Sequence, residues 1–295
     1  MPELPEVETV RRGLAPAMEG ARGDKVEVRH RGLRWPIAKD FEKRIEGKTV
    51  DGLGRRAKYL TADLSSGDVL LMHLGMSGSF RIGNDAKPGV YYHEKAKSTA
   101  HDHVVFHMSN GKTITFNDPR RFGMMKIVPR TKIEDEPLLR GIGPEPLGNE
   151  FDAAMLAAAC AGKKTSLKAA LLDQRVVAGL GNIYAAEALW HARIPPTAPA
   201  SSLSANDASR LLASIRKVIA RATGARYTDE SVNRLAVYDR EGKPCRRCGT
   251  KVERIVQAGR STYFCPRCQK TARTAKIGGK RRSRVAGAKS GSNER

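Results

Sequence analysis

The sequence opens with Met1-Pro2-Glu3-Leu4-Pro5-Glu6-Val7-Glu8-Thr9-Val10, and the interpretation of the remaining residues depends on this stretch. Removal of Met1 would give Pro2 a free secondary amine, and an α-amino group with a pKa of about 7.7–8 is partly unprotonated near neutral pH. Such an amine can form a Schiff base with an aldehyde-like carbon, and Glu3 or Glu6 could move the protons that the reaction needs. The same residues also suit a helix N-terminus, because Pro5 fits the first helical position and Glu6 complements the helix dipole. Both interpretations stay open at this point.

The charge balance predicts a polyanionic partner. The 295 residues include 53 Lys plus Arg against 31 Asp plus Glu, which gives a net charge of +22. A nucleic acid or an anionic membrane surface would satisfy this excess. The length suffices for two domains with hydrophobic cores. The sequence contains no run of 18 or more apolar residues, so we predict no membrane span. Its acidic N-terminus is unlike a secretory signal, and we therefore expect a cytosolic protein with reduced thiols.

The N-terminal part is expected to be a helix followed by strands. Val7, Val10 and Leu14 recur at helical spacing within residues 5–18. From about residue 25 to 130 the pattern changes to short strands, and Asn110-Gly111 is a strong hairpin turn. Turn signals between short strands predict a β-sandwich or barrel. The clearest expected strands are 25–30, 68–73, 103–108 and 112–116, and residues 84–100 are expected to form a polar surface loop.

The C-terminal part is expected to be helical. Pro and Gly are frequent in residues 131–149, which we interpret as a linker between domains. Ser204 is a plausible N-cap for a long helix with an apolar stripe from Leu211 to Ile219. Cys160 is expected to be a small core residue. Shorter helices are expected over 151–161, 167–172 and 183–192, and residues 271–295, which carry eight Lys or Arg, are expected to be a disordered basic tail.

Four cysteines near the C-terminus have the spacing of a zinc site. Cys245 and Cys248 are followed, after 16 residues, by Cys265 and Cys268. The pattern C-x2-C-x16-C-x2-C is typical of one tetrahedral zinc ion held by four thiolates, with a β-hairpin between the two pairs. Such a site is structural, because no coordination position is left for a catalytic water. Two disulfides or free thiols are the alternative.

Several motifs in a fixed order resemble one family, that of the bacterial formamidopyrimidine-DNA glycosylases. The resemblance covers about residues 2–269 and rests on independent motifs rather than on one. It implies an α+β protein with an N-terminal β-sandwich (1–130), a linker (131–149), a helix–two-turn–helix domain (150–236), a zinc finger (237–270) and a tail (271–295). The motifs are Pro2-Glu3-Leu4-Pro5-Glu6-Val7-Glu8-Thr9, Arg56-Ala57-Lys58-Tyr59-Leu60, His73-Leu74-Gly75-Met76-Ser77-Gly78, Asn117-Asp118-Pro119-Arg120-Arg121-Phe122-Gly123, Gly179-Leu180-Gly181-Asn182-Ile183-Tyr184 and Gly259-Arg260-Ser261-Thr262-Tyr263-Phe264-Cys265-Pro266.

The resemblance implies a bifunctional DNA glycosylase and AP lyase of base excision repair. Oxidised purines, namely 8-oxoguanine and formamidopyrimidines, would be turned out of double-stranded DNA. Pro2 would attack C1′ of the sugar and displace the base, and β,δ-elimination would then cut the strand. Glu3 matches the general acid and base of the family, and Glu6 matches a supporting carboxylate. A monomer in the bacterial cytosol, associated with the nucleoid, is implied.

The resemblance also assigns contacts to the DNA backbone. Lys58 and Arg260 match residues that grip the phosphates near the lesion, and Asn182 matches a phosphate contact at the start of a helix. Asn182 could equally be a simple N-cap, and Lys58 could belong to an ordinary basic strand. His73 and Tyr238 are further candidates for phosphate contacts.

Three other residues match the side chains that fill the place of the extruded nucleotide. Met76 is flexible, Phe122 can stack, and Arg120 can hydrogen-bond the orphaned base. Taken singly, Met76 and Phe122 could be core residues and Arg120 a surface charge. The glycines that flank Met76, at Gly75 and Gly78, favour an exposed loop.

The sequence departs from the family pattern in the loop after the long helix. Residues 225–236 are fewer and poorer in glycine than the loop that closes over the flipped base, and Asp239 replaces a usual glycine. The departure predicts a preference for formamidopyrimidines over 8-oxoguanine. The extra tail is expected to add DNA affinity by counterion release. Two other functions remain alternatives: a glycosylase for oxidised pyrimidines that resembles endonuclease VIII, and a zinc-ribbon DNA-binding protein without enzymatic activity.

Overall fold

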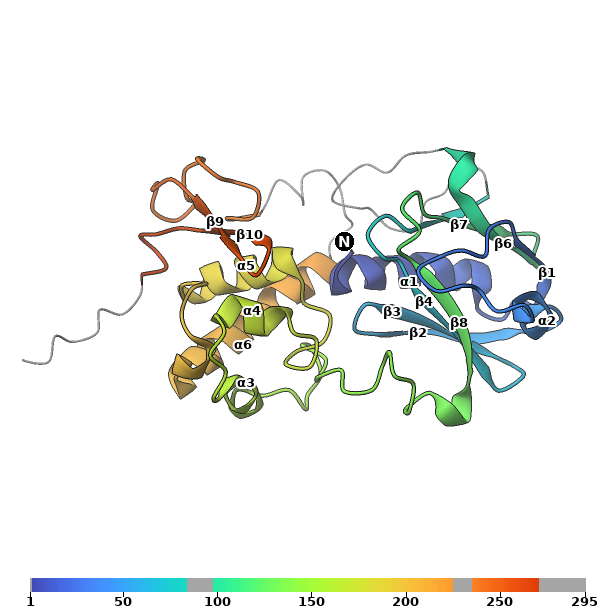
Figure 1. Cartoon of the computed structure of the whole chain (residues 1–295), viewed down its shortest axis with the longest axis horizontal. Helices are drawn as coiled ribbons and strands as arrows, with labels where there is room; N and C mark the ends of the chain where they lie inside the picture. Colours follow the sequence, from blue (N-terminus) through green and yellow to red (C-terminus); the bar gives the residue numbers. More distant parts are fainter. Residues whose placement is uncertain (1, 84–97, 225–234, 271–295) are drawn as a thin grey trace, which may run out of the picture.

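The computed structural model describes residues 2–83, 98–224 and 235–270 (Figure 1). Most of the polar loop and of the shortened loop expected from the sequence, and the whole basic tail, therefore lie outside the described residues. Within the described residues, no helix combines the length and apolarity needed to cross a bilayer.

The first helix, α1 (Leu4–Met18), begins at a reciprocal pair of hydrogen bonds between Glu3 and Glu6. The Glu3 backbone N–H donates to Glu6 Oε2 at 2.8 Å, and the Glu3 side chain accepts from the Glu6 backbone. This capping box satisfies two N–H groups that would otherwise lack partners at the helix end. Val10 and Leu14, on the apolar face, are fully buried. The helix expected over 5–18 is confirmed.

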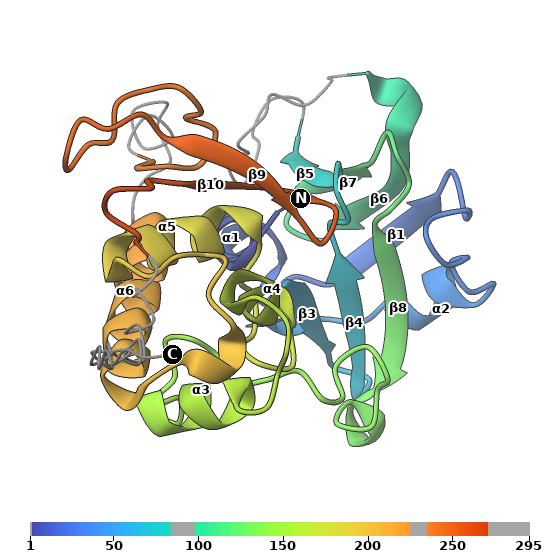
Figure 2. The ribbon, with the colours of Figure 1, turned by 60° about the vertical axis from the view of Figure 1, so that its left-hand side comes forward.

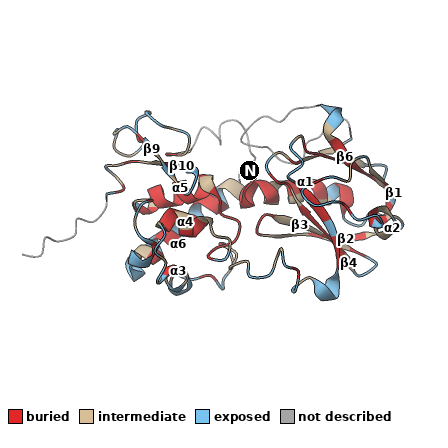
Figure 3. Cartoon of the chain, in the orientation of Figure 1, coloured by how far each residue is buried: buried red, intermediate tan, exposed pale blue. Residues whose placement is uncertain are grey.

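Two antiparallel four-stranded sheets follow α1 and share one core with it. The first sheet has the order β1 (Gly23–Val28), β6 (Asp102–Met108), β7 (Thr113–Asn117), β5 (Ser79–Ile82). The second has the order β2 (Val50–Arg56), β3 (Tyr59–Leu64), β4 (Asp68–His73), β8 (Met124–Pro129). Both sheets contribute buried residues, coloured red in Figure 3, to a single apolar cluster, so the expected β-sandwich is confirmed. Short helical segments, α2 (Phe41–Ile45), η1 (Thr99–His101) and η2 (Arg130–Lys132), lie between or after the strands.

A second apolar cluster holds the helices of the C-terminal half together (Figures 1 and 2). These helices are α3 (Ala153–Cys160), α4 (Leu167–Leu172), α5 (Asn182–Ala192), η3 (Ala200–Ser202) and α6 (Ala205–Gly224). Ser204 Oγ accepts the Asp207 N–H at 3.1 Å and so caps α6 as expected. Cys160 is fully buried in this cluster. The hairpin of β9 (Glu253–Gln257) and β10 (Arg260–Phe264) packs on α5.

Helix α1 joins the two halves, because its first residue belongs to the second core. Leu4 is buried in the helical cluster, whereas Val7 and later residues are buried in the β-sandwich. The Leu4 N–H donates to Gly179 O at 3.0 Å. Gly179 has φ +78°, and a Cβ there would lie 2.6 Å from Leu4 Cβ, so only glycine permits this contact. The start of α1 is thereby fixed at the junction of the two halves (Figure 1).

Candidate active site

The Glu3 carboxylate is buried at this junction and is held by the N-terminus of α5. Its oxygens accept the backbone N–H groups of Gly181 and Ile183 at 2.8 Å each, and that of Tyr184 at 3.3 Å. A Cβ at Gly181 would lie 2.3 Å from Glu3 Cδ, so a glycine is required for this approach. Burial raises the pKa of Glu3 to about 7, although Lys58 and the backbone N–H groups act against the rise. A carboxyl group with this pKa can donate or accept a proton near neutral pH.

Glu6 connects the helix start to Tyr184. The Tyr184 hydroxyl donates to Glu6 Oε1 at 2.6 Å, while Glu6 Oε2 accepts the Glu3 N–H. Both oxygens of the buried Glu6 are therefore engaged. Because Pro2 is bonded to the nitrogen that Glu6 holds, this arrangement also fixes where Pro2 lies. Pro2 itself is buried in the chain that still carries Met1.

Lys58 interacts electrostatically with Glu3 and lies in the turn between β2 and β3. Its ammonium donates to Leu180 O at 2.8 Å, and its side chain is buried. Burial lowers the pKa of Lys58, and the nearby Glu3 carboxylate opposes this change. The structure thus brings Glu3, Glu6 and Lys58 together from segments far apart in the sequence.

A cavity of about 330 Å³ opens beside Lys58, and cationic side chains share its wall with apolar ones such as Leu138 and Ile142. Lys58, His73, Arg260 and Arg34 all contribute to its wall. Burial lowers the pKa of His73 to about 4, with the charges of Lys58 and Arg34 acting in the same direction. Its Nδ1 accepts the Gly75 N–H at 2.9 Å, so the neutral ring carries its proton on Nε2 as a donor. Three cations and one neutral donor make the cavity suitable for an anion such as a phosphate. The sequence analysis did not single out Arg34.

Asn182 is not the N-cap of α5, which corrects one interpretation offered by the sequence. The N-cap is Gly181, and Asn182 occupies the first helical position. Asn182 Oδ1 accepts from Lys168 Nζ at 2.6 Å, and Asn182 Nδ2 donates to Ser261 O at 2.9 Å. Its amide also hydrogen-bonds the Tyr238 side chain. Asn182 therefore ties α5 to the β9–β10 hairpin.

Lys168, which the sequence analysis missed, lies beneath this contact. Its side chain is buried, and its ammonium also donates to Thr262 Oγ1 at 2.6 Å and to Ser261 O at 3.1 Å. Burial lowers the pKa of Lys168 to about 8, and the nearby Arg260 adds to the effect. In the sequence it resembles an ordinary surface lysine of an amphipathic helix, so no local signal marks it.

Met76, Arg120 and Phe122 lie on two loops whose backbones approach each other closely at Gly75 and Phe122. Met76 is 43% exposed and Phe122 is 44% exposed, which excludes the core positions that each could have taken. The Arg120 guanidinium carbon lies 4.7 Å from the centre of the Phe122 ring, a cation–π contact. Met76 belongs to the loop between β4 and β5, and the other two belong to the loop between β7 and β8. We call Met76, Arg120 and Phe122 the wedge residues.

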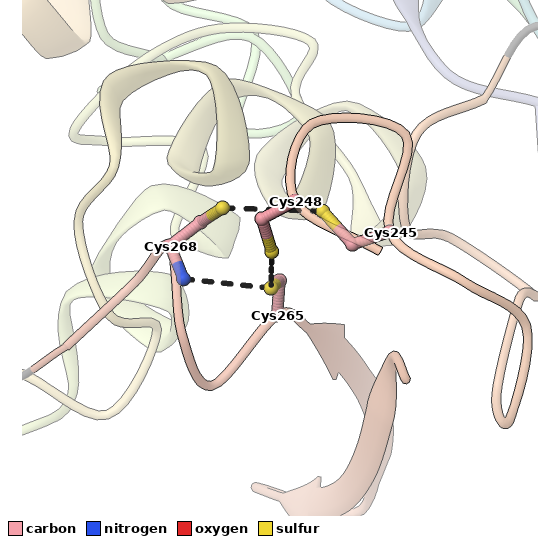
Figure 4. A group of neighbouring side chains, drawn as sticks. All are labelled: Cys245, Cys248, Cys265 and Cys268. Carbon is pink, nitrogen blue, oxygen red and sulfur yellow. Dashed lines mark hydrogen bonds between the residues drawn. The ribbon is translucent and has the colours of Figure 1, made fainter. Parts of the chain in front are cut away.

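The four C-terminal cysteines converge on one point (Figure 4). The sulfur atoms of Cys245 and Cys268 are 3.9 Å apart, and those of Cys248 and Cys265 are 3.5 Å apart. A tetrahedral zinc ion with Zn–S bonds of about 2.3 Å requires separations near 3.8 Å. All four thiols are free of disulfides, so the disulfide alternative is wrong. The cysteines form a site for one structural zinc ion.

The zinc site is attached to α5 by Trp190. The indole N–H donates to Cys245 Sγ at 3.4 Å, and the Arg247 guanidinium carbon lies 4.0 Å from the centre of the Trp190 ring. An N–H donor to a ligating sulfur orients the ligand. The fold of the hairpin that carries Arg260 is thereby coupled to the helix that holds Glu3.

Comparisons with known proteins agree along most of the chain. The family model for the formamidopyrimidine-DNA glycosylase N-terminal domain matches residues 1–125, and the model for the H2TH domain of the same glycosylase matches residues 142–232. A zinc finger found in FPG and IleRS matches residues 242–271. Along the chain, the first model covers the β-sandwich, the second covers the helical cluster and the third covers the zinc site.

Curated relatives and solved structures give the same result. Formamidopyrimidine-DNA glycosylases of Rhodopseudomonas palustris strains TIE-1 and BisA53 are 58% and 59% identical to this chain, over 92% of it and 100% of each relative. The Lactococcus lactis formamidopyrimidine-DNA glycosylase bound to DNA with an AP site superimposes with a TM-score of 0.82 at 32% identity, over 91% of this chain and 100% of that one. The Thermus thermophilus MutM (Fpg) structure gives a TM-score of 0.75 at 39% identity, over 91% and 98% of the two chains. The chain therefore belongs to the formamidopyrimidine-DNA glycosylase family.

Proposed function

We propose that this protein is a DNA glycosylase and AP lyase of base excision repair that removes oxidised purines from double-stranded DNA. The observation that carries the proposal is the buried Glu3 carboxylate, which follows Pro2 directly and is held by the backbone N–H groups of Gly181 and Ile183. A DNA-binding protein without chemistry would have no need for a buried acid with a pKa of about 7 beside its N-terminus.

The reaction begins when the Pro2 amine of the processed chain attacks C1′ of the damaged nucleotide. The N–C1′ bond forms, the glycosidic bond breaks, and the base leaves with the proton that the amine gives up. Glu3 then donates a proton to O4′ as the sugar ring opens to the iminium ion. The iminium acidifies the proton on C2′, so removal of that proton expels the 3′ phosphate, and a second elimination expels the 5′ phosphate. Glu6 keeps the Pro2–Glu3 segment in place throughout.

The surrounding residues bind and deform the DNA. Lys58, His73 and Arg260 hold the phosphates next to the lesion, since they line one cavity and each carries a hydrogen-bond donor. Asn182 and Tyr238 position the hairpin and add donors at its edge. The wedge residues enter the duplex and occupy the place of the extruded nucleotide. The zinc ion keeps the hairpin folded and takes no part in the chemistry.

Borohydride trapping tests the proposal directly. Borohydride reduces an iminium ion to a stable amine, so protein from which Met1 has been removed should become linked to a duplex with 8-oxoguanine, and peptide mapping should place the link at Pro2. The matched control is the same protein with a retained N-terminal extension, in which the Pro2 nitrogen is an amide. We expect that form to give no adduct. An adduct at Lys58, or equal adduct from the extended protein, would contradict the assignment.

The two alternative functions separate in the same experiment. A zinc-ribbon DNA-binding protein would bind the duplex and give no adduct with any lesion. A glycosylase that resembles endonuclease VIII would give adduct with an oxidised pyrimidine in preference to 8-oxoguanine. The family assignment favours the purine substrate. We further propose that the protein acts as a monomer at the bacterial nucleoid, because one chain holds both the acid and the phosphate cavity.

A further inference from the structure

A buried carboxylate, Asp118, connects the two loops that carry the wedge residues. Asp118 is fully buried and lies between β7 and the exposed Arg120. Its Oδ1 accepts a hydrogen bond from the Ser77 hydroxyl, and its Oδ2 accepts the Gly123 N–H at 2.7 Å. Ser77 follows Met76 directly, and Gly123 follows Phe122 directly. One side chain therefore holds the residue after each of two wedge positions.

Ser77 completes the connection through its second hydrogen bond. The Arg120 N–H donates to Ser77 Oγ at 3.1 Å, while the Ser77 hydroxyl proton goes to Asp118. The backbone of Arg120 is thus attached to the loop of Met76 by a side chain rather than by a strand ladder. The Asp118 backbone carbonyl accepts from buried His103 at 2.8 Å, so the backbone of Asp118 is anchored to β6.

The two loops are also in direct backbone contact. A Cβ at Gly75 would lie 2.3 Å from the Phe122 carbonyl carbon and 2.5 Å from the Gly123 nitrogen. Gly75 has φ +61°, which favours glycine as well. With the backbones this close, loss of the connecting hydrogen bonds would let the loops slide past each other, because no ladder pairs them among the described strands.

We propose that Asp118 and Ser77 are positioning residues that hold the loop of Met76 against the loop of Arg120 and Phe122, so that the wedge residues enter the duplex as one preformed unit. This inference rests on the proposed function. Neither residue needs to touch DNA. The three wedge side chains come from two separate loops. Insertion between stacked bases is efficient only if their relative positions are fixed before binding.

The test compares Ser77→Ala with Ser109→Ala on two substrates. Ser109 Oγ also accepts one backbone N–H, from Arg22 at 3.0 Å, but lies after β6, at the end of that strand away from Asp102. On a duplex with 8-oxoguanine, Ser77→Ala should lower the single-turnover rate of base release about tenfold, because both hydrogen bonds of the Ser77 hydroxyl are lost in the step that opens the duplex. Borohydride trapping on a single-stranded oligonucleotide with an AP site, which has no opposite base to hold away, should be unchanged. Ser109→Ala should match the wild type on both.

A double-mutant comparison separates positioning from a general loss of structure. If Ser77 acts through Met76, Ser77→Ala should cause no further loss on the duplex in a Met76→Ala background. Asp118→Asn, which retains the shape of the side chain, should show the same selective defect in the duplex. Equal losses on both substrates, or a Ser77→Ala rate on the duplex equal to that of Ser109→Ala, would overturn the inference. A wild type that gives no adduct on either substrate would instead contradict the proposed function. That result differs from both results that would overturn only the positioning role.

Discussion

At the scale of single residues, the proton on Glu3 couples the active site to the stability of the fold. Burial raises the pKa of Glu3 to about 7 from an ordinary value of 4.5. The folded protein therefore binds the Glu3 proton more tightly than the unfolded chain does. Glu3 contributes most to stability below pH 4.5, and this contribution is lost as the pH rises through 7.

Urea unfolding of the wild type and of Glu3→Gln across this pH range tests the coupling. Between pH 4.5 and about pH 8, the free energy of unfolding of the wild type should fall by about 3 kcal/mol relative to that of Glu3→Gln. The Pro2 nitrogen is an uncharged amide while Met1 is attached. Removal of Met1 places an ammonium beside Glu3, which lowers its pKa and should reduce the shift. Parallel stability curves for the wild type and Glu3→Gln would show that Glu3 titrates as it does in water.

Lys168 is a buried cation whose three hydrogen bonds all go to neutral acceptors. Its charge lies beneath Asn182 and near Arg260, so it should strengthen the attraction of this surface for phosphate. Since burial lowers the pKa of Lys168 to about 8, DNA affinity should fall as the pH rises above about 8 and the charge is lost. Lys168→Met should bind duplex more weakly and lose this pH dependence, as measured by fluorescence anisotropy. The exposed Lys132 supplies the control variant Lys132→Met, which should retain it.

At the scale of elements, the sequence predicted those helices and turns that interactions between neighbouring residues determine. The helical spacing of Val7, Val10 and Leu14 and the Asn110-Gly111 turn correspond to α1 and to the β6–β7 hairpin. The cysteine spacing predicted the zinc site for the same reason, because each pair forms its own turn.

The sequence could not reveal contacts between distant segments. The free backbone N–H groups at the N-terminus of α5 donate to Glu3, which lies 178 residues away from Gly181. No local pattern shows this partner, so the sequence left Asn182 as a candidate for the cap. Arg34 lines the cavity, and Lys168 contacts Asn182 and the hairpin, only because the β-sandwich, the helices and the hairpin pack together. The strands β2, β3, β5 and β8 were not individually predicted. In β2, Gly and Arg interrupt the apolar alternation, and β5 has only four residues.

The β9–β10 hairpin next to the zinc site should unfold separately from the β-sandwich. Chelation of zinc removes the ion that folds the hairpin, and the hairpin carries Arg260 and the partners of Lys168. The chain has two tryptophans, Trp190 at the zinc site and Trp35 in the N-terminal half, so each can be observed alone in a variant that replaces the other by Phe. With chelator, Trp190 emission should change together with the loss of DNA binding, while Trp35 emission stays constant. A simultaneous change of both would show that the halves unfold as one unit.

At the scale of the whole molecule, the positive charge is distributed between the folded body and the segment 271–295. That segment carries eight Lys or Arg, and we expect it to add DNA affinity without sequence preference. Each of its cations that pairs with a phosphate should steepen the dependence of log Kd on log salt by about 0.9. Deletion of residues 271–295 should therefore flatten that dependence for undamaged duplex between about 50 and 200 mM salt. A variant of full length with the eight cations replaced by Gln should behave like the deletion, since charge rather than chain length is responsible. The rate of base release at saturating enzyme should be the same in all three forms, because Glu3 and Lys58 lie in the folded body. An unchanged slope after deletion would mean that the body alone makes the ionic contacts with the DNA.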